Sequence, residues 1–313
     1  MSVLTLVKYH GLGNDFLVAL DGRGLDAAAR QRAGHAPTEP GDPGPSTGAD
    51  HVGELARALC DRHTGVGADG LLILRSAVSG GDVRMELRNA DGGRAETSGN
   101  GLRCFALATI EAGYLPGPEV AIETDAGVRR AILRHRYGHG SAEVSVEMGR
   151  LRVTSLDPVA DVLLPGSVAL PWPAWHVDAG NPHLVLLAPS LQGVVVAAIG
   201  PALEKQRPGG QNVEVATCGP GNGELSLLVW ERGAGMTLAC GTGSAAAAAA
   251  LHSAGISADR VRVHNPGGTV EVILAGDDPL AVVAELAGPV QRVARIEVEP
   301  ADLGEPGVVA VAP

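Results

Sequence analysis

The sequence predicts a mixed α/β (α+β) protein with two domains, and three observations support this prediction. Short runs of β-branched and aliphatic residues recur along the chain and are bounded by glycine, which is typical of strands. Apolar segments of helical length lie among them. The chain has 313 residues, of which 45% are hydrophobic, so it is long enough to build two medium-sized cores.

The predicted elements alternate along most of the chain. The strands are expected over residues 4–9, 71–76, 83–89, 142–148, 183–188, 225–230, 261–265, 270–275 and 295–300. The helices are expected over residues 52–63, 101–112 and 244–254. The last of these has alanine at every position from 245 to 250, and alanine is the residue with the highest helix propensity.

Two segments interrupt this alternation. Residues 31–50 contain four prolines and four glycines without apolar periodicity, so we expect a flexible surface excursion there. The segment around residues 138–140 separates one β-rich region from the next. It is the best candidate for a domain boundary.

Composition excludes several classes of function. The net charge is −11, aromatic residues make up 3% of the chain and basic clusters are absent, which argues against nucleic-acid binding. An apolar run of membrane-spanning length and a signal peptide are both absent from the sequence, so we expect a cytoplasmic protein without membrane contact. The four widely spaced cysteines are expected to be free thiols. Motifs with metal-ligand spacing are absent, so no metal site is expected.

A weak internal repeat marks the positions that carry chemistry. Asn89 stands nine residues before Ser98-Gly-Asn-Gly, and Glu231 stands nine residues before Cys240-Gly-Thr-Gly. Each motif follows a β-like run and precedes a helical one. The repeat therefore predicts two related halves, each with a small nucleophilic side chain at a helix N-terminus.

A helix N-terminus suits both anion binding and thiol chemistry. Its free N–H groups and positive dipole end bind anions, and they favour thiolate over thiol. We therefore expect Cys240 to act as a base near neutral pH, with glycines leaving room for the substrate.

Each of these features also has a structural interpretation. A single buried cysteine is usually inert, His183 after Asn-Pro is usually structural, and Glu231-Arg232 is typical of a surface ion pair. The duplicated setting favours catalysis for Cys240. Residues 65–70 match the dinucleotide pattern GxGxxG, but the predicted helix precedes the motif and the strand follows it, so it is not a cofactor site.

Six ordered segments carry a more specific resemblance. KYHGLGNDF, TGVGADG, RNADGGRAETSGNGLRCFA, GNPH, NVE and WERGAGMTLACGTGSAA resemble the hallmark segments of diaminopimelate epimerases, from about residue 4 to about residue 290. The resemblance implies two similar domains, each a curled sheet around a central helix, with the active site in the cleft between them. It also implies that a strand within about 288–299 returns to the first domain. The halves would then be 1–142 plus 287–313 and 143–286, with 31–50 as an insertion.

The resemblance also implies roles for single residues. Cys240, with Glu231 beside it, would be one acid/base, and Ser98, with His183 beside it, would occupy the position of the other. A homodimer that uses neither pyridoxal phosphate nor another cofactor is implied. The substrate-binding residues carried over are Asn14, Asn89, Gly99, Asn100, Gly101, Asn181, Asn212, Arg232, Gly241 and Thr242.

Three positions depart from the family pattern. Ser98 replaces the first cysteine, Gly70 replaces a longer polar residue and Met236 replaces a common glutamate. A serine hydroxyl titrates several units above the pKa of about 8.5 of a thiol, so Ser98 is a poor base unless His183 activates it. Cys104 lies six residues further along the same predicted helix and points elsewhere.

The function implied is interconversion of LL- and meso-diaminopimelate, which supplies lysine and peptidoglycan synthesis. Two alternatives stay open at this point. One is a related racemase or a one-thiol elimination enzyme that acts on another amino acid. The other is a binding protein with impaired catalysis. The retained asparagines and Arg232 favour a substrate with a second amino-acid end.

Overall fold

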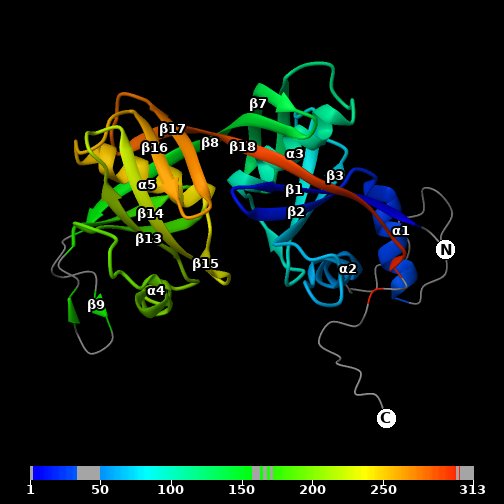
Figure 1. Cartoon of the computed structure of the whole chain (residues 1–313), viewed down its shortest axis with the longest axis horizontal. Coiled ribbons are helices and arrows are strands. Elements are labelled where there is room, and N and C mark those ends of the chain that lie inside the picture. Colours follow the sequence, from blue (N-terminus) through cyan, green and yellow to red (C-terminus); the bar gives the residue numbers. More distant parts are fainter. Residues whose placement is uncertain are drawn as a thin grey trace, which may run out of the picture.

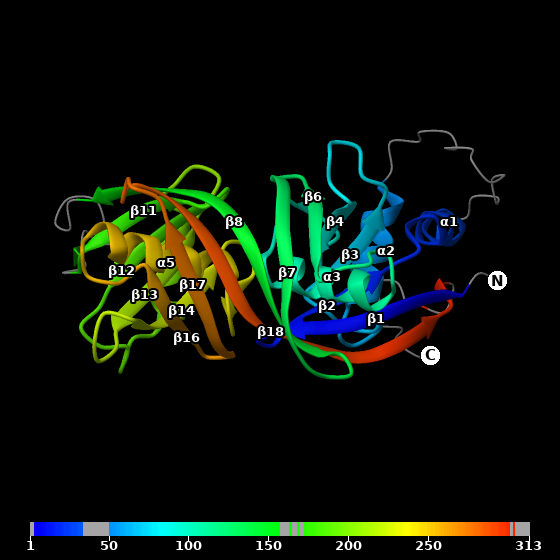
Figure 2. The same cartoon turned by 90° about the horizontal axis from the view of Figure 1, so that it is seen from above.

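Most strands of the protein belong to one continuous sheet that closes into two rings. The computed structural model describes residues 3–33, 50–156, 163–164, 168–169, 172–300 and 303. Within these ranges, a 16-stranded sheet closes on itself twice, because β8 and β18 pair with each other as well as with neighbours on both sides. Figures 1 and 2 show the two resulting lobes side by side, with β8 and β18 running between them. The predicted mixed α/β class with two similar halves is confirmed.

The first ring follows the spatial order β8, β7, β6, β4, β3, β2, β1, β18. Its strands are β1 (Leu4–Gly11), β2 (Asn14–Ala19), β3 (Gly70–Arg75), β4 (Val83–Asn89), β6 (Glu119–Thr124), β7 (Gly127–Gly138), β8 (Ser141–Leu156) and β18 (Ala281–Val298). The short β5 (Arg94–Ala95) pairs with β4.

The second ring follows the order β18, β17, β16, β14, β13, β12, β11, β8. Its further strands are β11 (Ala174–Asp178), β12 (Pro182–Leu187), β13 (Asn212–Cys218), β14 (Glu224–Glu231), β16 (Arg260–Asn265) and β17 (Gly268–Ala275). The short β15 (Gly235–Thr237) pairs with β14, and β9 (Leu163–Leu164) pairs with β10 (Val168–Ala169) apart from the large sheet.

The two rings repeat the same connections. In the first ring, β2 pairs parallel with β3 and β4 pairs parallel with β6. In the second, β12 pairs parallel with β13 and β14 pairs parallel with β16, while the other ring contacts are antiparallel in both halves. Asn89 ends β4 and Glu231 ends β14, so the weak sequence repeat corresponds to equivalent positions of the two halves.

Each ring encloses one helix. The helix α3 (Gly99–Glu111) contacts strands of the first ring, and α5 (Gly241–Ser253) contacts strands of the second. Every residue of α5 from Gly241 to Leu251 is buried, which explains a sequence of small residues with no polar face. Outside the rings lie α1 (Gly22–Arg32), α2 (His51–Cys60) and α4 (Val196–Glu204). Figure 1 shows α1 and α2 on the first lobe and α4 on the second.

The halves are connected by long strands and not by a linker. Residues Val283–Ala287 of β18 pair with β17, and residues Gln291–Val298 pair with β1. The expected C-terminal strand therefore does return to the first half. Gly138 and Gly140 lie at the β7–β8 hairpin, within the first ring. The division into 1–142 plus 287–313 and 143–286 stays a prediction.

The predicted excursion over 31–50 is shorter at both ends. Gln31 and Arg32 close α1, and the Asp50 carboxylate caps α2 by accepting from the Gly53 N–H at 3.0 Å. The remainder, 34–49, lies outside the described residues. None of the helices in the described ranges is long and apolar enough to cross a membrane.

Candidate active site

The N-termini of the two enclosed helices meet between the halves. Ser98 is the N-cap of α3 and Cys240 is the N-cap of α5, and both have extended backbone angles before a glycine starts the helix. A Cβ placed on Gly99 would stand 3.3 Å from the Gly241 Cα, and one placed on Gly241 would stand 3.1 Å from the Gly99 Cα. Only glycine at both positions lets the two helix ends approach this closely.

A side chain also crosses the junction of the two helix ends. The Asn100 amide Nδ2 donates to the Ala239 carbonyl at 3.1 Å and to Asn14 Oδ1 at 3.2 Å. Ala239 immediately precedes Cys240. The α3 end is therefore bonded to the backbone that carries the candidate thiol.

Cys240 lies in a polar but enclosed environment. Its side chain is 5% exposed, and its Sγ accepts from the Gly243 N–H at 3.3 Å and lies 3.3 Å from Thr242 Oγ1. The partly buried Glu231 lies close enough for its carboxylate to act on the Cys240 thiol, and Glu231 Oε1 accepts from the Thr237 hydroxyl at 2.5 Å. Cys240, Thr242 and Glu231 are thus brought together as predicted.

The expected low pKa of Cys240 is wrong for this closed arrangement. Burial raises the pKa of Cys240 well above its ordinary value, and the Glu231 and Glu214 carboxylates raise it further. Hydrogen bonds from Thr242 and the Gly243 N–H oppose this rise but do not overcome it. Burial also raises the pKa of Glu231, with help from Glu214. The helix dipole was the only effect visible in the sequence, and desolvation is the larger one.

Ser98 has far fewer partners than Cys240. Its Oγ accepts from the Gly101 N–H at 3.1 Å, the usual N-cap bond, and the residue is half-buried. Among the described residues, Ser98 has no hydrogen bond to a carboxylate or to an imidazole. The predicted His183 partner of Ser98 is therefore not bonded to it in this structure.

His183 instead forms a buried pair with the Glu214 carboxylate. Its Nδ1 lies 2.7 Å from Glu214 Oε1, and both side chains are fully buried. Its Nε2 lies 2.9 Å from Asn181 Oδ1. A Cβ on Gly243 would stand 2.6 Å from Glu214 Oε1, so this pair packs against the first turn of α5. Glu214 was not predicted as a site residue, because β13 is buried on both faces from Asn212 to Ala216 and its pattern does not single out one side chain.

The remaining predicted residues surround the two helix ends unevenly. Asn14 follows the two-residue turn Leu12–Gly13, where both residues have positive φ, and its Nδ2 donates to Asp69 Oδ2 at 2.7 Å. Asn212 Oδ1 accepts from the Arg232 backbone N–H at 2.9 Å. Asn89 is exposed at the end of β4 and has a backbone bond to Gly93. Asn14 is hydrogen-bonded to Asn100 at the α3 end, whereas Asn212 and Arg232 lie in the half that contains α5.

A charged cluster holds the turn that carries Asn14. Asp15 pairs with Lys8 at 2.8 Å and with Arg62 at 2.6 Å, and Arg62 also pairs with Asp69 at 2.7 Å. Burial opposes ionisation of Asp15, but hydrogen bonds from Arg62 and Lys8 lower its pKa to about 2. Asp15 therefore stays ionised at neutral pH, and Asp69 orients the Asn14 amide by accepting its hydrogen bond.

One of the departures from the family pattern, Gly70, has a local explanation. A Cβ on Gly70 would stand 2.7 Å from the Arg88 carbonyl and 3.3 Å from the Phe16 ring, so a longer side chain does not fit this backbone. Met236 is 56% exposed on β15. Nothing in the structure explains its replacement of glutamate. Cys104 is fully buried in the core, as its helical phase predicts.

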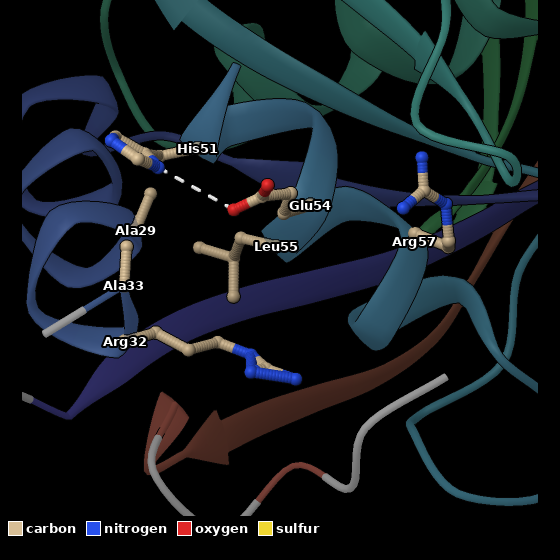
Figure 3. A pocket seen from close by; sticks show the side chains of 7 residues that line it. All are labelled: Ala29, Arg32, Ala33, His51, Glu54, Leu55 and Arg57. Atoms are coloured by element: carbon tan, nitrogen blue, oxygen red, sulfur yellow. Dashed lines mark hydrogen bonds and ion pairs between the residues drawn. The ribbon is translucent and has the colours of Figure 1, made fainter. Parts of the chain in front are cut away.

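A separate hollow lies between α1 and α2, away from the helix ends. Figure 3 shows its lining, which consists of Ala29, Arg32, Ala33, His51, Glu54, Leu55 and Arg57. It contains none of the predicted site residues.

All four cysteines are free thiols, as predicted. Within the described ranges, clusters of three or more side chains that could hold a metal are absent.

Comparisons with known proteins point to one family. The family model described as diaminopimelate epimerase matches residues 45–154 and 175–293. Diaminopimelate epimerase from Prochlorococcus marinus is 37% identical over 88% of this chain and 86% of its own length. The enzyme of the same name from Synechocystis is 33% identical over 93% of this chain and 97% of its own length.

Solved structures share the fold at lower sequence identity. A hydroxyproline epimerase from Agrobacterium vitis has a TM-score of 0.68 at 20% identity and covers 95% of this chain and 91% of its own. A PhzF-family phenazine biosynthesis protein from Bacillus anthracis has a TM-score of 0.67 at 16% identity, with 95% and 99% coverage. At these identities the likeness shows the two-lobed fold alone.

Proposed function

Because the chain belongs to the diaminopimelate epimerase family, we propose that it is an isomerase that interconverts LL- and meso-diaminopimelate. The reaction inverts one α-carbon by removing its proton from one face and adding a proton to the other. Its product serves lysine and peptidoglycan synthesis.

One observation supports this function above the others. The two helix N-termini are in backbone contact, with one acid/base candidate capping each of them. A carboxylate placed at this junction meets the free N–H groups of both helices at once. Its α-carbon would then lie between Cys240 and Ser98, the arrangement that inversion requires.

We propose that Cys240 and Glu231 act as one unit on their face. Burial and the neighbouring carboxylates raise the pKa values of both groups, which favours the protonated thiol and suits it to donate its proton. In the other direction, the thiol passes its proton toward Glu231 as it takes the α-proton. Charge that develops on the substrate carboxylate is stabilised by the helix ends.

The proposed substrate has a second amino-acid end that needs its own partners. Arg232 is exposed, and within the described part of the chain its side chain has no ion pair and donates one long hydrogen bond, from Nη1 to the Gly209 carbonyl at 3.4 Å. Its backbone is fixed by Asn212, so its guanidinium is available to a distal carboxylate. Asn14, Asn89 and Asn181 are proposed to bind the same substrate, as are Gly99, Asn100, Gly101, Gly241 and Thr242 around the reacting carboxylate.

The test is incubation of the protein with LL-diaminopimelate in deuterated water. Deuterium incorporation at the α-carbon together with formation of the meso isomer is expected. Incorporation with retained configuration would instead indicate a one-base enzyme. If neither occurs while the ligand binds, the chain is a binding protein.

We also propose that the protein is a cytoplasmic homodimer. Four free cysteines, three of them buried, fit a reducing compartment. The dimer rests on the family resemblance, and sedimentation equilibrium tests it.

A further inference from the structure

Arg103 is a fully buried arginine that the proposed mechanism does not use. It has 0% exposure and is the largest fully buried side chain among the described residues. It lies in the second turn of α3, on the same face as Asn100 three residues earlier. Its Nη2 donates to Asn100 Oδ1 at 2.7 Å.

The charge of Arg103 has no counter-ion. No carboxylate in the described part of the chain forms an ion pair with it, and its Nε and Nη1 have no hydrogen-bond partner there. Burial lowers the pKa of Arg103 to about 10, which leaves it protonated at neutral pH. Arg88 is similarly buried, at 3% exposure, but it pairs with Glu86 at 2.9 Å and also with Asp50. A buried charge is normally paired in this way.

The position of this charge is also unfavourable by itself. The N-terminal end of a helix carries a partial positive charge, and a cation near it is repelled. Side chains tilt toward the helix N-terminus, and the bond to Asn100 shows that Arg103 does so. Helix dipole and guanidinium therefore add up to a positive potential at the α3 end, which an anion would neutralise.

The surrounding backbone is shaped to hold the guanidinium at the crossing of the two halves. A Cβ on Gly11, at the end of β1, would stand 3.1 Å from Arg103 Nη2. One on Gly288 would stand 3.4 Å from Arg103 Cζ. Gly288 lies in β18 between the part that pairs with β17 and the part that pairs with β1. Two glycines thus leave room for a cation that the chain does not neutralise.

Asn100 connects Arg103 to the candidate site. Because a guanidinium only donates hydrogen bonds, the Asn100 oxygen must face Arg103. The Asn100 Nδ2 is then directed to Asn14 and to the Ala239 carbonyl. Arg103 therefore fixes the amide that joins the α3 end to the residue before Cys240.

We propose that Arg103 is a positioning residue for the reacting carboxylate, which supplies the anion that the buried guanidinium lacks. Arg103 acts through Asn100 and through its charge, without touching the substrate. This proposal rests on the proposed function only in taking the anion to be the α-carboxylate of the amino-acid substrate.

The test compares three variants of the full chain, Arg103→Met, Arg103→Lys and, as the matched control, Arg88→Met. Melting temperatures are measured without and with LL-diaminopimelate, and α-proton exchange gives kcat and KM. Without ligand, Arg103→Met should melt near the wild-type temperature, because relief of an unpaired buried charge offsets the loss of its hydrogen bond to Asn100. Arg88→Met should melt lower, since it removes the buried ion pair with Glu86 and the ion pair with Asp50.

With ligand, Arg103→Met should be the more strongly affected of the two variants. Arg103→Met should lose the ligand-induced rise in melting temperature, and its kcat/KM should fall by at least about thirtyfold, because the nearby positive charge and the orientation of the Asn100 amide are lost together. Arg103→Lys should recover part of it. Arg88→Met should keep the wild-type KM.

Three outcomes would overturn the role of Arg103. They are a wild-type kcat/KM in Arg103→Met, a ligand-free melting temperature as low as that of Arg88→Met, and no recovery in Arg103→Lys. A wild type that is stabilised by the ligand but exchanges no proton would refute the proposed function alone. A wild type that does not bind the ligand would refute both.

Discussion

The two helix ends that meet between the halves have the same backbone but different surroundings. Cys240 at the α5 end is 5% exposed and is accompanied by Thr242, Glu231 and the buried His183–Glu214 pair. Ser98 at the α3 end is half-buried and has only its N-cap bond. On the α3 side the charged group is Arg103, which lies in the second turn of the helix and not at its N-cap. The two halves share the geometry of the helix ends, whereas the thiol, the carboxylates and the imidazole lie on the α5 side.

The largest effect is expected from removing the thiol. Cys240→Ala should lower α-proton exchange by at least about a hundredfold on every isomer of diaminopimelate, within the range that a positioned general acid or base contributes. Cys218→Ala is the matched control, because Cys218 is an exposed thiol at the end of β13. Exchange in deuterated water measures both. Exchange at the wild-type rate in Cys240→Ala would show that the base lies elsewhere.

Restoring a thiol on the poorer side should make the two faces more alike. Ser98→Cys should raise epimerisation by at least about tenfold, because a thiol is a far better base than a hydroxyl. The isomer whose α-hydrogen faces position 98 should gain most. Separate exchange rates for the LL and meso isomers, with Ser98→Ala as the hydroxyl-free control, measure this. An unchanged rate in Ser98→Cys, with equal exchange of both isomers in the wild type, would make Ser98 an adapted catalytic group.

The acidic surroundings of Cys240 predict a change in its titration. Glu231→Gln removes a negative charge that raises the pKa of Cys240, so thiolate should form at lower pH in this variant. The pH dependence of iodoacetamide alkylation measures the shift, in a Cys218→Ala background that removes the exposed thiol. A titration moved to higher pH would show that the Glu231 charge does not govern the thiol. Exchange activity should fall in the same variant, because Glu231 no longer accepts the proton.

The smallest effect concerns the caps themselves. Ser98→Ala removes the hydrogen bond from the Gly101 N–H, and the loss of an N-cap costs about 1 kcal/mol. Thermal unfolding should show a decrease of a few degrees. A larger loss would mean that Ser98 makes stabilising contacts beyond its cap bond.

The sequence predicted both central helices and nine of the strands, but it missed α1, α4 and several buried strands, among them β2 and β13. Both central helices begin at glycine, two or three residues before their predicted starts, because the N-cap bond and burial outweigh glycine's low propensity. The helix α4 escaped prediction because it contains Gly200 and Pro201. A Cβ on Gly200 would stand 2.4 Å from the Trp230 ring, so packing demands the glycine that local propensity disfavours.

The candidate site shows the same limit. The repeat placed Ser98 and Cys240 at equivalent helix ends because each motif lies within one short segment. The His183–Glu214 pair joins residues 31 positions apart, and local spacing does not reveal such a contact. The sequence also gives no sign that Arg103 lacks a counter-ion, because this depends on all the residues that surround the guanidinium in the fold. Burial likewise decided the pKa of Cys240, against the helix-end argument.

The strand that both rings share has a consequence for how the chain folds. Residues Leu4–His10 of the first strand pair with Gln291–Val298 of the last one, and the same last strand also completes the second ring. Neither ring of the sheet can close before β18 has been synthesised and has left the ribosome. Contacts of such large sequence separation are slow to form because the intervening loop must first lose its entropy. During synthesis both lobes therefore wait with unpaired edges, and this is the period in which the nascent protein is most exposed to aggregation.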